Sequence, residues 1–374
     1  MPDAAEWGDA GSNTLGNIAK KRGALELPTM GKLGIGHLTE IPGTPPEPNP
    51  SGAFGKMAIY SQGKDTMTGH WEMVGIKPEA PFRTYPEGFP PDLIEEFCRR
   101  AGVEGILGNE VASGTEIIER LGEAHIKTGL PIVYTSADSV FQVAAHEGHF
   151  GLDRLYHVCE VARELLQPPH RVGRVIARPF IGEDQASFKR TSNRHDYALV
   201  PPHMLLNDIV EAGMTVQAVG KIGDIFVDKG ITWGEHTKDN RHGVQMIHDC
   251  LDRHEKGLIF ANLVDFDMLY GHRRDVEGYA NALLDFDEAL GPIMAKLGPK
   301  DVLIVTADHG NDPTFKGTDH TREYVPVLLW GEAIKPGATF GTRPRLSDLG
   351  ATIADLLGVK FTAWGESYAD LIQR

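Results

Sequence analysis

The sequence predicts an α/β protein with a mainly parallel sheet flanked by helices and a smaller, inserted α/β unit. Two apolar, β-rich runs in the C-terminal half, residues 258–264 and 302–306, each stop shortly before acidic residues. Such runs are typical of buried parallel strands. Residues 91–180 alternate helical and β-rich segments, which indicates a separate α/β unit. The length of 374 residues also exceeds what one hydrophobic core usually serves.

The N-terminal elements come first along the chain. Residues 12–21 are expected to form a helix, and residues 40–51, dense in proline and glycine, a surface loop. Residues 63–72 are rich in hydroxyl groups and flanked by glycine, which favours a turn that leads into a helix. The proline-rich stretch at residues 81–91 is the best candidate for a domain boundary.

Beyond this boundary we expect an inserted unit at residues 82–200, and a discontinuous core at residues 1–81 and 201–374. The insert is predicted to contain helices at 91–101, 114–121 and 152–166, and strands near 106, at 131–135 and at 174–180. In the second core segment the predicted elements are a helix at 203–210, a strand at 215–219, an amphipathic helix at 275–297 and a Ser347-capped helix at 347–357.

Five residues near the ends of the two apolar runs suggest a metal centre. Asp267 and His272 follow the first run, Asp308 and His309 follow the second, and His320 lies a little further on. The carboxyl ends of parallel strands open into the crevice where α/β sheets bind ligands. Imidazole suits zinc, iron or manganese, and carboxylate suits manganese or magnesium. Two such ions can clamp an in-line phosphoryl transfer.

A plainer interpretation exists for each residue, because Asp and His often end strands as capping and turn residues. For one residue alone the two interpretations are about equally good. All five residues together, after two strands, favour the metal centre.

The segment at residues 63–72, GKDTMTGHWE, offers a nucleophile for such a centre. Metal coordination can activate a threonine hydroxyl, and free amides at a helix N-terminus favour a phosphate. Asp65, Thr66 and Thr68 are also common capping residues, so the segment alone is only suggestive. Beside two metal ions, Thr66 or Thr68 becomes a candidate carrier of a covalent phosphate.

Composition excludes some classes of function. The net charge of −15 argues against a nucleic-acid partner. Cys98, Cys159 and Cys250 are few and widely spaced, which suits a reducing cytoplasm. No apolar run approaches the roughly 18 residues of a membrane-spanning helix.

The ordered motifs resemble those of the bacterial phosphopentomutase family, in the alkaline phosphatase superfamily, over essentially the whole chain. The matching segments are GKDTMTGHWE (63–72), YTSADSV (134–140), GRVIARPF (173–180), NRHDY (193–197), GKIGD (220–224), NLVDFD (262–267), GHRRD (271–275), TADHGND (306–312) and GTDHTREYVP (317–326). The resemblance implies an alkaline-phosphatase-like core with an inserted cap domain that closes over the site.

The resemblance also implies an isomerase with a phosphorylated Thr66. Such an enzyme interconverts ribose or deoxyribose 1-phosphate with the 5-phosphate through a 1,5-bisphosphate, as part of nucleoside catabolism in the cytoplasm. Its implied cofactors are two divalent ions, with Mn²⁺ expected, and a sugar bisphosphate that phosphorylates Thr66. One ion is implied on Asp267, His272 and His320, and the other on Asp308, His309 and the group on Thr66.

The residues expected to contact the pentose phosphate are Asp138, Arg178, Arg194 and Lys221. Guanidinium groups match phosphate oxygens, although both arginines could instead pair with carboxylates on an acidic protein. Asp138 could bind a sugar hydroxyl or cap a helix. His70, His146 and His195 lack metal spacing, and each is expected to be a packed or surface histidine.

Family members place one further metal-binding aspartate on an N-terminal strand that ends in Asp-Ser. We expect this strand to be missing from the sequence, because Met1 corresponds to a position just after it. Asp3 and Asp9 align with later positions and are not expected to be ligands. We accordingly expect weak occupancy of the second site and low activity in this form.

Three other functions stay open. A cofactor-independent phosphoglycerate mutase would share the site, but Thr66 in place of serine and the short insert argue against it. A phosphatase would need an open site. A metal-poor binding protein would be separated from both enzymes by its metal content.

Overall fold

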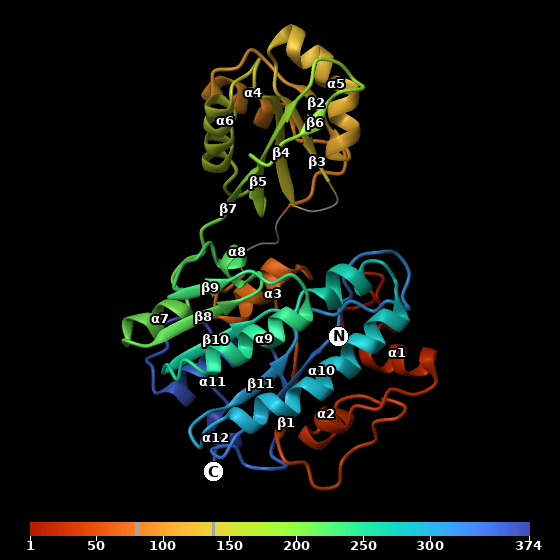
Figure 1. Cartoon of the computed structure of the whole chain (residues 1–374), viewed down its shortest axis with the longest axis vertical. Coiled ribbons are helices and arrows are strands. Elements are labelled where there is room, and N and C mark those ends of the chain that lie inside the picture. Colours follow the sequence, from red (N-terminus) through yellow and green to blue (C-terminus); the bar gives the residue numbers. More distant parts are fainter. Residues whose placement is uncertain (79–82, 137–138) are drawn as a thin grey trace. The chain divides into compact units, whose positions relative to one another are not determined.

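The computed structural model describes residues 1–78, 83–136 and 139–374. The chain divides into two compact units, a core of Met1–Ala80 with Pro201–Arg374 and an inserted unit of Pro81–Val200. Both units combine helices and strands, as the α/β prediction requires (Figure 1). None of the helices in the described part of the chain has the length and apolar character needed to cross a bilayer.

The strands in the described part of the core lie in two sheets. One sheet has the order β11-β12-β1-β13 and the other the order β10-β8-β9. The strands are β1 (Ala53–Met57), β8 (Thr215–Val219), β9 (Trp233–Glu235), β10 (Gly257–Ala261), β11 (Leu303–Thr306), β12 (Val325–Trp330) and β13 (Thr339–Arg343).

The helices of the core cover these sheets. They are α1 (Thr14–Arg22), α2 (Pro28–Leu33), η1 (Ile35–His37), α3 (Thr66–Met73), α7 (Leu205–Glu211), α8 (Ile222–Phe226), α9 (Asn240–Leu251), η2 (Phe266–Gly271), α10 (Val276–Lys296), α11 (Ser347–Leu357) and α12 (Ala369–Ile372). As Figure 1 shows, α9 and α10 run beside each other. The apolar face expected on α10 is real, since Leu283 and Leu290 are buried in a cluster with residues of α1 and α2.

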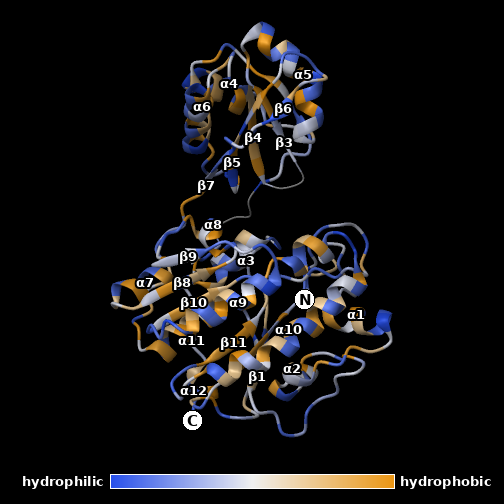
Figure 2. Ribbon diagram, viewed as in Figure 1, coloured by the Kyte–Doolittle hydropathy of each residue, from blue (hydrophilic) through white to orange (hydrophobic). Residues whose placement is uncertain are grey.

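The strands described in the inserted unit, outside residues 81–82 and 137–138, form one sheet. Its strands β2 (Leu107–Val111), β3 (Ile132–Thr135), β4 (Val140–His146), β5 (Arg174–Ile181) and β6 (Lys189–Arg190) are neighbours in this order, and β7 (His195–Ala198) also pairs with β5. Helices α4 (Pro91–Ala101), α5 (Gly114–Thr128) and α6 (Leu152–Leu165) pack on it. In Figure 2 the apolar residues of this unit gather in and around the strands.

The relation between β10 and β11 differs from the prediction that both are buried parallel strands. β10 pairs in parallel with β8, but β11 pairs antiparallel with β12, and the two strands end different sheets. Both strands are only half-buried. They are half-buried because both strands line a cavity of about 1500 Å³.

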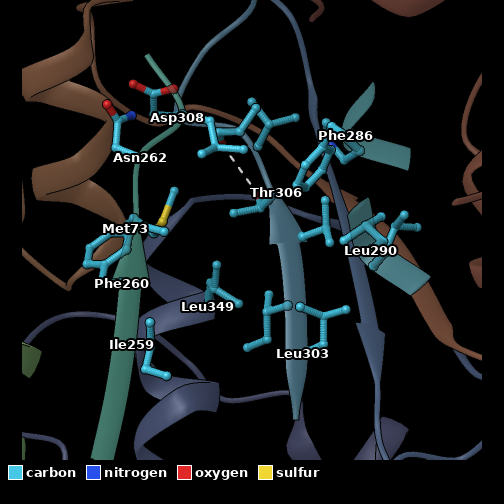
Figure 3. A pocket seen from close by; sticks show the side chains of 18 of the residues that line it. Met73, Ile259, Phe260, Asn262, Phe286, Leu290, Leu303, Thr306, Asp308 and Leu349 are labelled. Atoms are coloured by element: carbon cyan, nitrogen blue, oxygen red, sulfur yellow. Dashed lines mark hydrogen bonds between the residues drawn. The ribbon is translucent and has the colours of Figure 1, made fainter. Parts of the chain in front are cut away.

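This cavity is apolar along the strands and polar at one end. Figure 3 shows Phe260 on β10 and Leu303 on β11 along its apolar part, while Asn262 and Asp308 lie near its upper end. In the parallel β8–β10 pair, Val219 lies opposite Ala261, so the chain leaves both strands at the same edge. Several of the expected site residues line the cavity.

Candidate metal centre

Thr66 is the first residue of α3, at the position expected for a nucleophile at a helix N-terminus. Asp65 caps the helix by accepting a hydrogen bond from the Thr68 amide at 3.0 Å, an interaction generally worth about 0.5–2 kcal/mol. The Thr68 hydroxyl also donates to Asp65 and is engaged in this cap. The Thr66 Oγ1 instead lies 3.2 Å from His309 Nε2. Of the two threonines, Thr66 therefore faces the candidate metal ligands.

Asp267 and His272 come together because the segment after β10 forms the π-helix η2. The amide of His272 donates to the carbonyl of Asp267 at 3.0 Å, which is the five-residue hydrogen bond that defines such a turn. The wider turn brings residues five apart to one side. Asp267 Oδ2 lies 3.2 Å from His272 Nε2. Short π-helices frequently mark functional sites.

His320 completes this first ligand set. Its Nε2 lies 3.3 Å from Asp267 Oδ1, and its ring centre lies 4.7 Å from that of His272. One ligand atom from each of the three residues falls within 4.8 Å of the others. The Nε2 of His320 is buried and has no well-formed hydrogen bond among the described residues. An orphaned ring nitrogen that faces a carboxylate and a second imidazole fits a divalent ion of the manganese or zinc type.

Asp308 and His309 form a second set directly after β11. Asp308 Oδ2 lies 3.3 Å from His309 Nε2 and 3.0 Å from His70 Nδ1. The rings of His309 and His320 have centroids 4.1 Å apart, so the two sets adjoin. With Thr66, this set offers one carboxylate, one imidazole and one hydroxyl.

In the first set, the carboxylate of Asp267 favours the protonated form of the imidazoles beside it. Burial opposes ionisation of Asp267, but the contacts with the His272 and His320 imidazoles outweigh it and lower the pKa of Asp267. The Asp267 contact raises the pKa of His272. Burial lowers the pKa of His320, yet Asp267 and Asp319 prevail and raise it to about 10. An ion that binds here displaces protons from imidazole, as metal binding to histidine generally does.

The second set is charged differently. Burial would raise the pKa of Asp308, but the neighbouring His309 and His70 lower it to about 2. Burial lowers the pKa of His309, so its imidazole is neutral. A neutral imidazole beside an ionised carboxylate is the protonation state that a metal ion requires of its ligands.

The residues that contact the candidate ligands were not predicted from the sequence. Asn311 donates to Asp267 Oδ1 at 2.6 Å, Asp319 contacts His320 Nδ1 at 3.5 Å, and Lys64 contacts Asp319 at 3.2 Å. His70 was expected to be a packed or surface histidine; it is buried, but its Nδ1 also contacts the carbonyl of Thr66 at 2.8 Å and the carboxylate of Asp308. The four-residue spacing from Thr66 to His70 on one helix was the signal that could have found it.

The expected substrate contacts are more scattered. Lys221 lines the cavity together with Thr66 and His70. In the inserted unit, Arg178 donates to Gln142, and Arg194 donates twice to Asp196, at 2.6 Å each.

The remaining expected positions have different surroundings. Asp138 lies outside the described residues. Asp3 pairs with the buried Arg322, and Asp9 pairs with Lys64 at 2.9 Å. His146 is buried, whereas His195 is exposed.

Comparison with known proteins defines the class first. The metalloenzyme superfamily model matches residues 1–361, so the chain is a member of that superfamily. The cluster of Asp267, His272 and His320 fits a protein of this class. The phosphopentomutase of Symbiobacterium thermophilum is 72% identical over the whole chain and 95% of its own length. Those of Desulfitobacterium hafniense and Clostridium kluyveri are 55% and 54% identical, over 98% and 100% of the chain and 95% and 96% of their own lengths. The chain belongs to the phosphopentomutase family.

Proposed function

We propose that the chain interconverts ribose 1-phosphate, or deoxyribose 1-phosphate, with the corresponding 5-phosphate through a phosphothreonine at Thr66. The observation that carries this proposal is the position of the Thr66 hydroxyl, at the start of α3 and 3.2 Å from His309. The relatives named phosphopentomutase support the pentose as substrate and argue against the phosphoglycerate mutase and phosphatase alternatives.

The proposed reaction has two balanced phosphoryl transfers. In the first, the Oγ1–P bond of phosphorylated Thr66 breaks as a sugar hydroxyl forms a new P–O bond, and the proton of that hydroxyl ends on Thr66. The product is a sugar 1,5-bisphosphate. In the second transfer, Thr66 Oγ1 forms a bond to the other phosphorus as the P–O bond to the sugar breaks, and the Thr66 proton ends on the sugar oxygen of the released isomeric monophosphate. A catalytic amount of bisphosphate is needed to phosphorylate Thr66 initially.

The residues of the centre prepare Thr66 for this exchange. The free amides at the start of α3 favour the negative phosphate. The neutral His309 beside Thr66 Oγ1 and the ionised Asp308 keep the second set ready for an ion. Two divalent ions, for which we propose Mn²⁺, would neutralise the charge that develops on the transferring group.

Contacts to the rest of the substrate belong to the same proposal. Lys221 lines the same cavity as Thr66. Arg178, Arg194 and Asp138 are proposed from residue type and family resemblance. We also propose a cytoplasmic setting within nucleoside catabolism, in line with the unpaired Cys98, Cys159 and Cys250.

Conversion of ribose 1-phosphate to ribose 5-phosphate, followed by ³¹P NMR with Mn²⁺ and a trace of ribose 1,5-bisphosphate, tests the proposal. We expect isomerisation to exceed release of inorganic phosphate. Phosphate release that outpaces isomerisation would show a phosphatase. Isomerisation of 3-phosphoglycerate but not of ribose 1-phosphate would show the other mutase.

A further inference from the structure

Arg274 lies two residues after His272 and ties together the segments that carry the metal ligands. Its guanidinium donates to acceptors on η2 and on two stretches of the loop that runs from His309 to His320. The acceptors are the carbonyls of Gly271 (3.2 Å), Asp312 (2.8 Å), Asp319 (2.9 Å) and Gly317, and the side-chain oxygen of Asn311 (3.0 Å). A planar guanidinium has five N–H donors in a fixed fork. Nε and Nη2 contact one acceptor each, and the two N–H groups of Nη1 are shared among the Gly271, Asn311 and Asp312 acceptors.

The contact between Arg274 and Asn311 determines how the Asn311 amide is oriented. Arginine can only donate hydrogen bonds, so the Asn311 oxygen must face Arg274. The Asn311 NH₂ group is then directed at Asp267, where it donates to Oδ1 at 2.6 Å. The guanidinium thereby fixes the donor that holds a carboxylate of the first ligand set.

Two backbone features make room for this arrangement. A Cβ atom on Gly271 would lie 2.4 Å from the Asn311 side-chain nitrogen, so a residue without a side chain is needed there. Arg274 itself has φ of 55°, in the left-handed region that residues other than glycine seldom adopt. A residue held in that conformation by its surroundings is often part of a functional site.

We infer that Arg274 and Asn311 are a positioning pair that sets the geometry of Asp267, His272 and His320 before an ion binds. The inference rests on the metal centre of the proposed function and extends it beyond the ligands. Asp267 and His272 come from η2, whereas His320 comes from a loop more than 40 residues further along the chain. The guanidinium bridges these two segments, so the ligand atoms meet without help from the ion.

Titration of metal-free protein with Mn²⁺, followed by electron paramagnetic resonance of the free ion, tests this role. Arg274→Met and Asn311→Ala should each weaken binding of the tightest ion by about 10–100-fold, the range found for residues that orient metal ligands. Arg274→Lys keeps the charge but loses the fork, and it should fall between Arg274→Met and the unmodified protein. Arg273→Met is the matched control, because Arg273 is an exposed neighbour.

The outcomes separate this inference from the proposed function. If the unmodified protein binds no Mn²⁺, the metal centre itself is wrong. If it binds Mn²⁺ and all the Arg274 and Asn311 variants bind equally well, the positioning role is wrong. A purely structural role would lower the melting temperature of the metal-free variants and leave the dissociation constant of the folded protein unchanged, which would also overturn the inference.

Discussion

The two ligand sets of the centre adjoin each other, yet they are supported in different ways. The first set, Asp267 with His272 and His320, has Asn311, Arg274 and Asp319 behind it. In the second set, Asp308 Oδ2 is already shared between His309 and His70, and the third group is the neutral hydroxyl of Thr66. We therefore expect the first set to be a preformed site and the second to need another anionic ligand.

Because of this difference, metal occupancy of the centre should change during the reaction. A phosphate on Thr66 would add negative oxygens to the second set and leave the first set unchanged. Divalent ions bind more tightly as the number of charged oxygen ligands rises. Occupancy of the second set should therefore depend on the phosphorylation state of Thr66, and occupancy of the first set should not.

The largest effect is expected from loss of the nucleophile. Thr66→Ala should reduce isomerisation at least about a thousandfold, because removing a nucleophile abolishes the covalent route. Thr66→Ser keeps a hydroxyl and should retain part of the activity. Mapping of the phosphopeptide after incubation with ribose 1,5-bisphosphate identifies the acceptor. Phosphate on Thr68, or full activity in Thr66→Ala, would remove Thr66 from the mechanism.

Substitution of one aspartate in each set tests whether the two sets differ in their affinity for Mn²⁺. Asp267→Asn removes the charge of the first set and should abolish tight Mn²⁺ binding, with a loss of about 100-fold or more in affinity. Asp308→Asn should leave the tight ion in place and lower turnover. Elemental metal content of the purified variants provides the measurement. Equal loss of metal in both variants would mean that the two sets are one cooperative site.

The sequence predicted which residues gather at the candidate centre better than it predicted how they are held. Strands that end at acidic residues indicate where ligands gather, because this depends on local pattern and on chain direction. The antiparallel pairing of β11 with β12 was missed, since partners far apart in the sequence leave no local signal. Strands β1, β4, β12 and β13 were also not predicted.

The supporting residues were missed for a similar reason. Asn311 and Arg274 act through contacts with residues distant in the sequence. The sequence around each of them does not distinguish it from an ordinary turn residue. The five-residue spacing of Asp267 and His272 would place them apart on an ordinary α-helix, and the structure resolves this with the π-helix η2. Local sequence could not reveal that turn.

A substitution in the inserted unit should lower kcat/KM for the sugar phosphate and leave metal binding at both ligand sets unchanged. Arg194→Ala should lower kcat/KM about tenfold or more, because loss of a charge-assisted phosphate contact costs about 1.5–3 kcal/mol. Arg120→Ala is the control, since Arg120 is in another exposed ion pair of this unit, with Glu110. An unchanged kcat/KM in Arg194→Ala would leave Arg194 as a partner of Asp196 alone.

The smallest effect concerns His125, whose hydrogen-bond partners among the described residues are the Leu130 carbonyl and the His146 amide, whereas His320 contacts carboxylates. Burial lowers the pKa of His125, whose Nε2 accepts a hydrogen bond from the His146 amide at 2.8 Å. Because the unfolded chain binds the proton more readily, the His125 contribution to stability is present above the unfolded pKa of about 6.5 and is lost as pH falls below it.

Hydrogen exchange of the His146 amide, compared between pH 7 and pH 5, measures this loss. After correction for the intrinsic pH dependence of exchange, protection should fall at the lower pH in the unmodified protein. His157→Gln, at an exposed position, should show the same fall. Protection that does not change with pH would mean that His125 keeps its proton state on unfolding.

The central claim is that the first ligand set is formed in advance and that the second depends on phosphorylated Thr66. Titration of metal-free protein with Mn²⁺, before and after phosphorylation by ribose 1,5-bisphosphate, tests it most directly, with Thr66→Ala as the variant that cannot be phosphorylated. The account predicts one tightly bound ion per unphosphorylated chain, a second ion after phosphorylation, and no second tight ion in Thr66→Ala. Two equally tight ions in the unphosphorylated chain, or no gain on phosphorylation, would contradict it.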